Sequence, residues 1–141
     1  MKKIQIEEKY RPLIELWIED LIMNPELQGS DELLGNGNKY CCLGRLCIVA
    51  GIDKDEIKYE SFIREDLFGY KHDLLPDKFI GEINPGSILY ILTTMNDGVS
   101  KWAVKNARDE LKKWGITKEK YTFPEIADFL EKHIEYYEKE K

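Results

Sequence analysis

The residues of this 141-residue chain most able to do chemistry are its three cysteines, Cys41, Cys42 and Cys47. Thiolates bind zinc, exchange disulfides or act as nucleophiles. A structural zinc site needs four ligands, usually as two close pairs, and this spacing supplies neither a second pair nor a fourth ligand. Adjacent cysteines form only a strained disulfide, and no base is placed beside a catalytic thiol. We therefore expect reduced thiols and no metal.

The stretch that holds the cysteines, YCCLGRLCIVA at 40–50, is apolar almost all round, which is typical of a helix in the middle of a domain. Cysteine is among the most buried residue types, so packing alone explains all three. Gly44 would suit the close passage of a neighbouring backbone, and Gly51 would end the helix. Arg45 is the exception, because its guanidinium needs a carboxylate or solvent, and we take it as a candidate binding residue.

A second candidate is the segment 100–114, SKWAVKNARDELKKW, which we expect to form a helix ended by Gly115. Four cations recur along one face of this helix: Lys101, Lys105, Arg108 and Lys112. Such a stripe would suit an acidic partner or phosphate groups. The alternative is an ordinary solvated face.

A third candidate is the turn at Asn96-Asp97-Gly98. Asp97 has the side chain of an N-cap for the following helix. Alternatively, Asn96 and Asp97 line a polar cleft beside Tyr40 and Arg45 that takes a small, nucleotide-like ligand or supports hydrolysis. No serine or histidine base is placed by the sequence, so we predict no catalytic residue.

A fourth candidate is the irregular segment 61–86, which contains several glycines and prolines and four aromatic residues. Long loops in compact domains are often functional, which makes Phe68 and Tyr70 candidate contacts for a partner. The alternative is that these rings pin the loop to the core.

The elements that would position these residues are mostly helical. Pro12 favours a first helix over 12–23. Its expected apolar face consists of Leu13, Leu16, Trp17 and Leu21, with Ile14 and Ile18 at the edge. Thr122 with Glu125 forms a capping box for a last helix over 122–137. Between them we expect the cysteine helix, a short helical turn after Asp53, and helices over 87–96 and 100–114. Gly35-Asn36-Gly37-Asn38 predicts a β-hairpin within 28–41. The fold class is therefore mainly α, with minor β structure: one compact domain of four to five helices and a small hairpin.

The composition restricts the possible partners. Hydrophobic residues make up 43% of the chain and charged residues 34%, as in a folded domain. A formal charge of −6 argues against a general nucleic-acid binder. No apolar run has the length of a signal peptide core or a membrane span, so we expect a cytoplasmic protein with no membrane contact and no cofactor. No particular oligomeric state is favoured.

The motif YCCLGRLC at 40–47 resembles the YCCLGxLC signature of small uncharacterised proteins of tailed phages and prophages. Further elements of that family have counterparts in Gln28-Gly29, Met95-Asn96-Asp97 and the segment TFPEIADFLE at 122–131. Arg45 departs from the small apolar residue usual there. The resemblance implies a phage or prophage accessory protein and no catalytic residue. We therefore expect non-catalytic binding of a host component, a host protein or a small molecule, in the host cytoplasm. Counteracting host defence is one role that this binding would serve.

Overall fold

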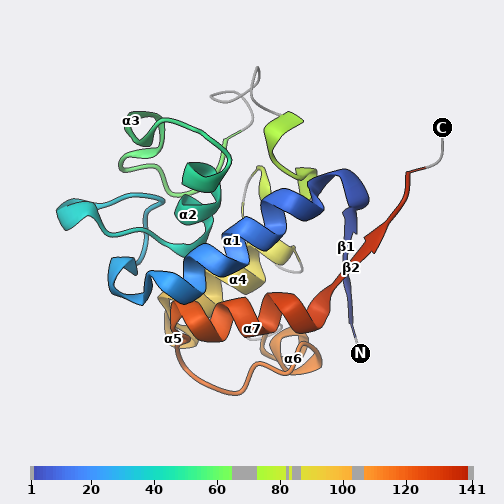
Figure 1. Cartoon of the computed structure of the whole chain (residues 1–141). Helices are drawn as coiled ribbons and strands as arrows, with labels where there is room; N and C mark the ends of the chain where they lie inside the picture. The colour runs from blue at the N-terminus through green and yellow to red at the C-terminus, as the bar shows by residue number, and fades with distance from the viewer. Residues whose placement is uncertain (1, 65–72, 82, 84–86, 103–106, 140–141) are drawn as a thin grey trace.

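The computed structural model describes residues 2–64, 73–81, 83, 87–102 and 107–139. It confirms the mainly α class (Figure 1). The described α-helices are α1 (Arg11–Met23), α2 (Cys42–Val49), α3 (Lys54–Ile57), α4 (Ile88–Asp97), α5 (Val99–Trp102), α6 (Ala107–Lys113) and α7 (Phe123–His133). The strands are β1 (Ile4–Glu7) and β2 (Ile134–Tyr137), and short 3-10 turns cover Glu8–Tyr10, Pro25–Leu27, Asn36–Asn38 and Asp77–Phe79.

α1 packs against α7 and α2, and α4, whose residues 89–96 are all buried, contacts α2 and α7 (Figure 1). Trp17 of α1 is fully buried, and its indole Nε1–H donates to the carbonyl of Cys42 at 2.8 Å. Its ring meets Phe79 edge to face, with the ring centroids 5.3 Å apart. A buried tryptophan needs such a partner for its N–H, and here the hydrogen bond fixes α1 against α2.

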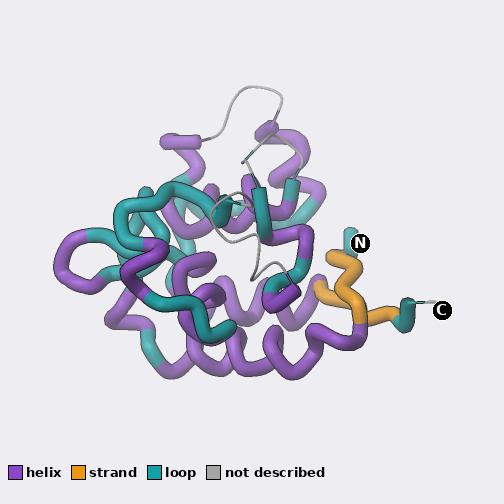
Figure 2. Tube along the Cα trace, turned by 90° about the horizontal axis from the view of Figure 1, so that it is seen from above, coloured by secondary structure: helices purple, strands orange, loops and turns teal. Residues whose placement is uncertain are grey.

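The last helix ends earlier than predicted, at His133 instead of Tyr137. Residues 134–137 form β2, which pairs in parallel with β1 in the register Ile4 with Ile134. These strands lie at one end of the helices, close to both termini (Figures 1 and 2). The helix prediction failed because the partner strand lies at the other end of the sequence, and pairing with it overrides local helix preference.

The predicted hairpin at 28–41 is wrong. The segment forms a 3-10 turn at Asn36–Asn38 and isolated bridges, two of them from Tyr40 to Gln28 and to Leu34. Gly37 and Asn38 do adopt positive φ, 72° and 56°, as their residue types suggest. The backbone groups of the segment bond elsewhere, however, as when Leu33 N–H donates to the carbonyl of Glu60. This non-local bonding replaces the ladder of a hairpin.

Several predicted helix ends are confirmed. Thr122 Oγ1 accepts from Glu125 N–H at 3.3 Å and the Glu125 carboxylate accepts from Thr122 N–H at 3.0 Å, which completes the capping box. Gly115 follows α6 with a φ of 78°. The predicted helix over 100–114 is described only as α5 and α6, since 103–106 lie outside the described residues.

The proposed N-cap role of Asp97 is wrong. Asp97 belongs to α4, which Gly98 ends with a φ of 124°. The Ser100 N–H near the start of α5 donates instead to both carboxylate oxygens of Glu119, at 2.9 and 3.2 Å. Among the described residues, no helix is both long and apolar enough to cross a membrane.

Candidate functional site

The cysteines lie in the core. All three are buried and unbridged, and Cys42 Sγ lies 3.9 Å from the carbonyl of Leu92. Burial raises the pKa of the Cys41 thiol to about 12 and also raises the pKa values of Cys42 and Cys47. A thiol protonated at neutral pH is a poor nucleophile. In the described part of the chain, no group of three or more histidine, cysteine or acidic side chains is arranged to hold a metal ion.

Arg45, the charged residue of the cysteine helix, faces α1. Its Nε and Nη2 groups donate to the two carboxylate oxygens of Asp20, each at 2.8 Å. The guanidinium also lies over the Tyr40 ring, 4.6 Å from its centroid. The side chains of Arg45 and Asp20 are only 11% and 15% exposed, so this bidentate pair joins α2 to α1. These contacts give Arg45 a structural role in place of the predicted role in binding.

Asn96 is fully buried and does not line a cleft. Its Oδ1 accepts from the Cys42 N–H and from Gln28 Nε2, both at 3.2 Å. Its Nδ2 donates to the Gly29 carbonyl and to the Asp97 carboxylate, both at 2.8 Å. All four hydrogen-bonding positions of the amide are therefore used inside the protein, which corrects the prediction of a ligand cleft at this position.

The side chains of Asn96 and Gln28 cap two other helices. Cys42 is the first residue of α2, and its N–H has no partner within the helix. Phe123 is the first residue of α7, and its N–H donates to Gln28 Oε1 at 3.0 Å. Asn96 and Gln28 thus satisfy one N-terminal donor each and also bond to one another. The motifs around 28, 42, 96 and 123, which the sequence separates widely, meet in this one network.

Gly44 allows the chain to pass close to α2. A Cβ atom built at Gly44 would lie 1.8 Å from the carbonyl oxygen of Leu33. Any larger residue would force the 29–34 segment away from α2, and that segment carries the Gly29 carbonyl that Asn96 binds. The residues at 28–29, 42–44 and 96 therefore maintain the packing of the core.

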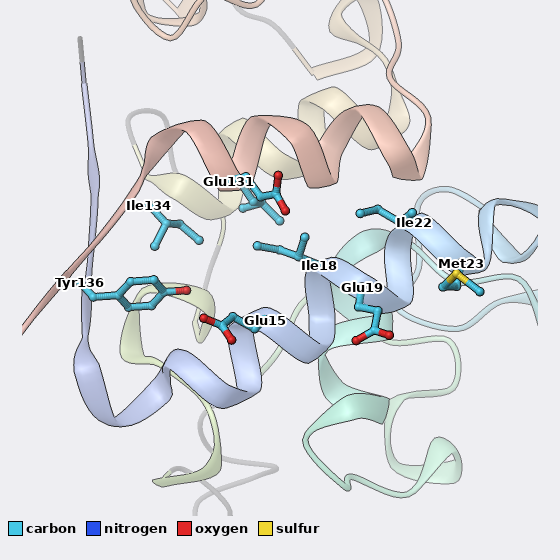
Figure 3. Close-up of a pocket in the computed structure, with 9 residues that line it drawn as sticks. Glu15, Ile18, Glu19, Ile22, Met23, Glu131, Ile134 and Tyr136 are labelled. Carbon is cyan, nitrogen blue, oxygen red and sulfur yellow. The ribbon is translucent and has the colours of Figure 1, made fainter.

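An apolar groove, of about 380 Å³, lies between α1 and the C-terminal end of α7 (Figure 3). We call it the α1–α7 groove. Figure 3 shows α1 on one side of it, with Ile134 and Tyr136 of β2 closing one end. Its lining residues are Glu15, Ile18, Glu19, Ile22, Met23, Leu130, Glu131, Ile134 and Tyr136. Two apolar side chains of the lining, Ile22 and Met23, are 47% and 69% exposed.

Carboxylates surround this apolar surface. Glu15, Glu19 and Glu131 all line the α1–α7 groove and are exposed. Arg11 stands at the β2 end, with its guanidinium 4.0 Å from the centroid of the Tyr136 ring and 3.7 Å from Glu15. Burial raises the pKa of Tyr136, an effect that Arg11 opposes. The groove therefore combines an apolar floor with a predominantly negative rim.

The predicted basic stripe is described only in part. Lys101 pairs with Asp31, and Lys105 lies outside the described residues, as do Phe68 and Tyr70. Arg108 and Lys112 are exposed and line a small hollow of about 210 Å³. Among the described members of the stripe, Arg108 and Lys112 therefore share a hollow and Lys101 does not line it.

The sequence reasoning missed the α1–α7 groove. A signal was present, since the first helix carries more apolar residues than one buried face requires, and Ile22 and Met23 lie outside its predicted apolar face. Leu16, which was predicted to be buried, is 55% exposed. Comparison with models of protein families, with curated proteins and with solved structures finds no match for this chain.

Proposed function

We propose that this protein acts by binding another protein and not by catalysis, with the α1–α7 groove as its binding surface. The observation that carries the proposal is the pair of exposed apolar side chains, Ile22 and Met23, beside a hollow of about 380 Å³. Scattered exposed apolar residues are common. Apolar residues gathered at a hollow between two helices form a continuous surface, however, and a partner that covers this surface removes it from water.

The partner segment that fits best is a basic, amphipathic helix. Its apolar side would cover Ile22 and Met23, and its lysines or arginines would meet the glutamates of the rim. A second copy of the chain is a poorer occupant, because two such grooves would bring their carboxylates together in a protein whose formal charge is −6. Charge complementarity therefore favours a different, basic protein.

The sequence resemblance supplies the biological setting of this proposal. In a phage or prophage accessory protein the partner is a host component, and its sequestration would counteract a host function such as defence. A small-ligand role at Asn96 and Asp97, the alternative that the sequence offered, has less support because Asn96 is enclosed.

The test uses a fluorescent peptide whose leucine and lysine residues are spaced to form an amphipathic helix. Its binding to the protein is measured by fluorescence anisotropy. We expect Ile22→Ala to weaken binding at least about fivefold, as for a residue at the centre of an interface. Leu16→Ala is the matched control, because Leu16 is equally exposed on the same helix but does not line the groove. The affinity for the peptide should also fall as the salt concentration rises, and this dependence on salt should be smaller for Glu19→Gln.

Two outcomes would contradict the proposal. Equal effects of Ile22→Ala and Leu16→Ala would mean that the groove is not the site. A peptide with glutamate in place of lysine that binds equally well would rule out a basic partner.

A further inference from the structure

A second hollow, of about 500 Å³, lies between α7 and the chain that follows α6. We call it the lysine hollow. Its lining combines basic and aromatic side chains and is separate from the α1–α7 groove. The charged residues of the lining are Lys112, Lys113, Lys118, Lys132, Glu125 and Asp128.

The lysine hollow has an excess of positive charge. Lys118 pairs with Glu125, and Lys132 lies 2.9 Å from Asp128. The Lys113 ammonium lies 3.8 Å from the carboxylate of Glu110, which also binds Lys2. The lining therefore holds four ammonium groups and two carboxylates, in a chain whose formal charge is −6. An anion is favoured here, against the charge of the whole protein.

Part of the uncharged lining is a cluster of buried rings. Phe129 and His133 stack with their ring centroids 4.2 Å apart, and Trp114 contacts both rings, at 5.9 and 5.4 Å. These three side chains are at least nine-tenths buried, so they form a fixed wall. His133 Nδ1 is held 2.8 Å from the carbonyl of Phe129, which fixes the orientation of the imidazole.

Tyr121 adds an oriented donor. Its hydroxyl oxygen accepts from the N–H groups of Thr117 and Lys118, at 2.9 and 3.1 Å. These two bonds occupy both lone pairs of the oxygen, so the phenol hydrogen remains available to an acceptor. The adjoining smaller hollow shares Lys112 and Lys118 and adds Arg108, which extends the basic surface.

We infer that the lysine hollow binds a small organic anion, one that carries a phosphate or carboxylate on an apolar, ring-sized body. The ammonium groups and the Tyr121 hydroxyl would bind the anionic group, and the wall of Trp114 and Phe129 would take the apolar body. This site is independent of the proposed function at the α1–α7 groove. A polyanion is disfavoured, because the positive excess is local and small.

The test uses phenyl phosphate as the probe. Its binding is measured from the chemical-shift changes of the protein's backbone amides in nitrogen–proton correlation spectra. We expect saturable shifts of the amide signals of Thr117 and Lys118 on addition of phenyl phosphate. Inorganic phosphate and benzyl alcohol each resemble only one half of the probe, so each should bind at least about tenfold more weakly. Lys112→Gln and Lys113→Gln should each weaken binding at least about threefold. Lys54→Gln, an exposed lysine on α3, is the matched control and should change nothing.

Three results would overturn the inference. Phenyl phosphate that binds no better than inorganic phosphate would show only general attraction to exposed lysines. Amide shifts at Ile22 and Met23 in place of Thr117 would assign the probe to the α1–α7 groove. The variant Ile22→Ala distinguishes the two sites, because it should leave the binding of phenyl phosphate to the lysine hollow unchanged. A short single-stranded oligonucleotide that binds more tightly than phenyl phosphate would make the site a nucleic-acid surface.

Discussion

Gln28 Nε2 donates to Asn96 Oδ1 at 3.2 Å and so joins the two side chains that bind the first N–H groups of α7 and α2. Gln28 Nε2 also donates to the carbonyl of Tyr121 at 2.8 Å. Because buried polar groups are costly when unpaired, the members of such a network stabilise the fold together and are lost together.

The first prediction concerns Asn96. Asn96→Ala leaves the buried Cys42 N–H and the Gly29 carbonyl without their partner, so we expect the free energy of unfolding to fall by about 3 kcal/mol or more. Asn36→Ala, at an exposed asparagine, should cost less than about 0.5 kcal/mol. Urea denaturation measures both. Similar losses for the two variants would mean that the network contributes little to stability.

The second prediction concerns the ion pair of Arg45 and Asp20. Asp20→Asn removes the charge but keeps the shape, and leaves a largely buried guanidinium without its counter-ion, so the loss should be about 2 kcal/mol. Glu19→Gln removes a neighbouring exposed carboxylate and should change stability by less than about 0.5 kcal/mol. Thermal unfolding of the two variants at low and high salt measures both effects. An Asp20→Asn variant as stable as the unmodified protein would contradict the structural role of the pair.

The third prediction concerns Gly44. Alanine is the better helix former by on the order of 1 kcal/mol, but its Cβ would lie 1.8 Å from the Leu33 oxygen. The clash is with backbone, so we expect Gly44→Ala to destabilise the protein by more than about 2 kcal/mol. Gly35→Ala is the control, because its Cβ would meet only the end of the Glu32 side chain, at 3.2 Å. A stabilising Gly44→Ala would disprove the close approach of the two segments.

The fourth prediction concerns pH and the thiols. Burial raises the pKa of Cys41 to about 12, from an ordinary value near 9.0, so the unfolded chain loses its thiol protons first as the pH rises. The folded state therefore gains stability from keeping the Cys41 thiol protonated. This contribution is complete below about pH 9 and is lost progressively from there to about pH 12. We expect stability to fall above about pH 9, and the three thiols to react slowly with a thiol reagent until the protein unfolds. Rapid labelling of the native protein at pH 8 would contradict this arrangement.

Local features of the fold could be predicted from the sequence because their causes lie within a few residues. The capping box of Thr122 and Glu125, the helix that starts beside Pro12 and the stop at Gly115 each depend on contacts at short sequence separation. The interpretation of the cysteines as core residues was also within reach, since an apolar helix and the burial preference of cysteine are properties of the residues themselves.

The tertiary structure decided everything that depends on a distant partner. It paired Ile4–Glu7 with Ile134–Tyr137, gave Arg45 its carboxylate, and enclosed Asn96 among groups from two other segments. It also set α1 beside α7, which leaves Ile22 exposed at a groove while Ile18 is buried. The physical reason is that residue type specifies which groups need a partner, whereas only the packed chain determines which partner is near and which surface is left open to water.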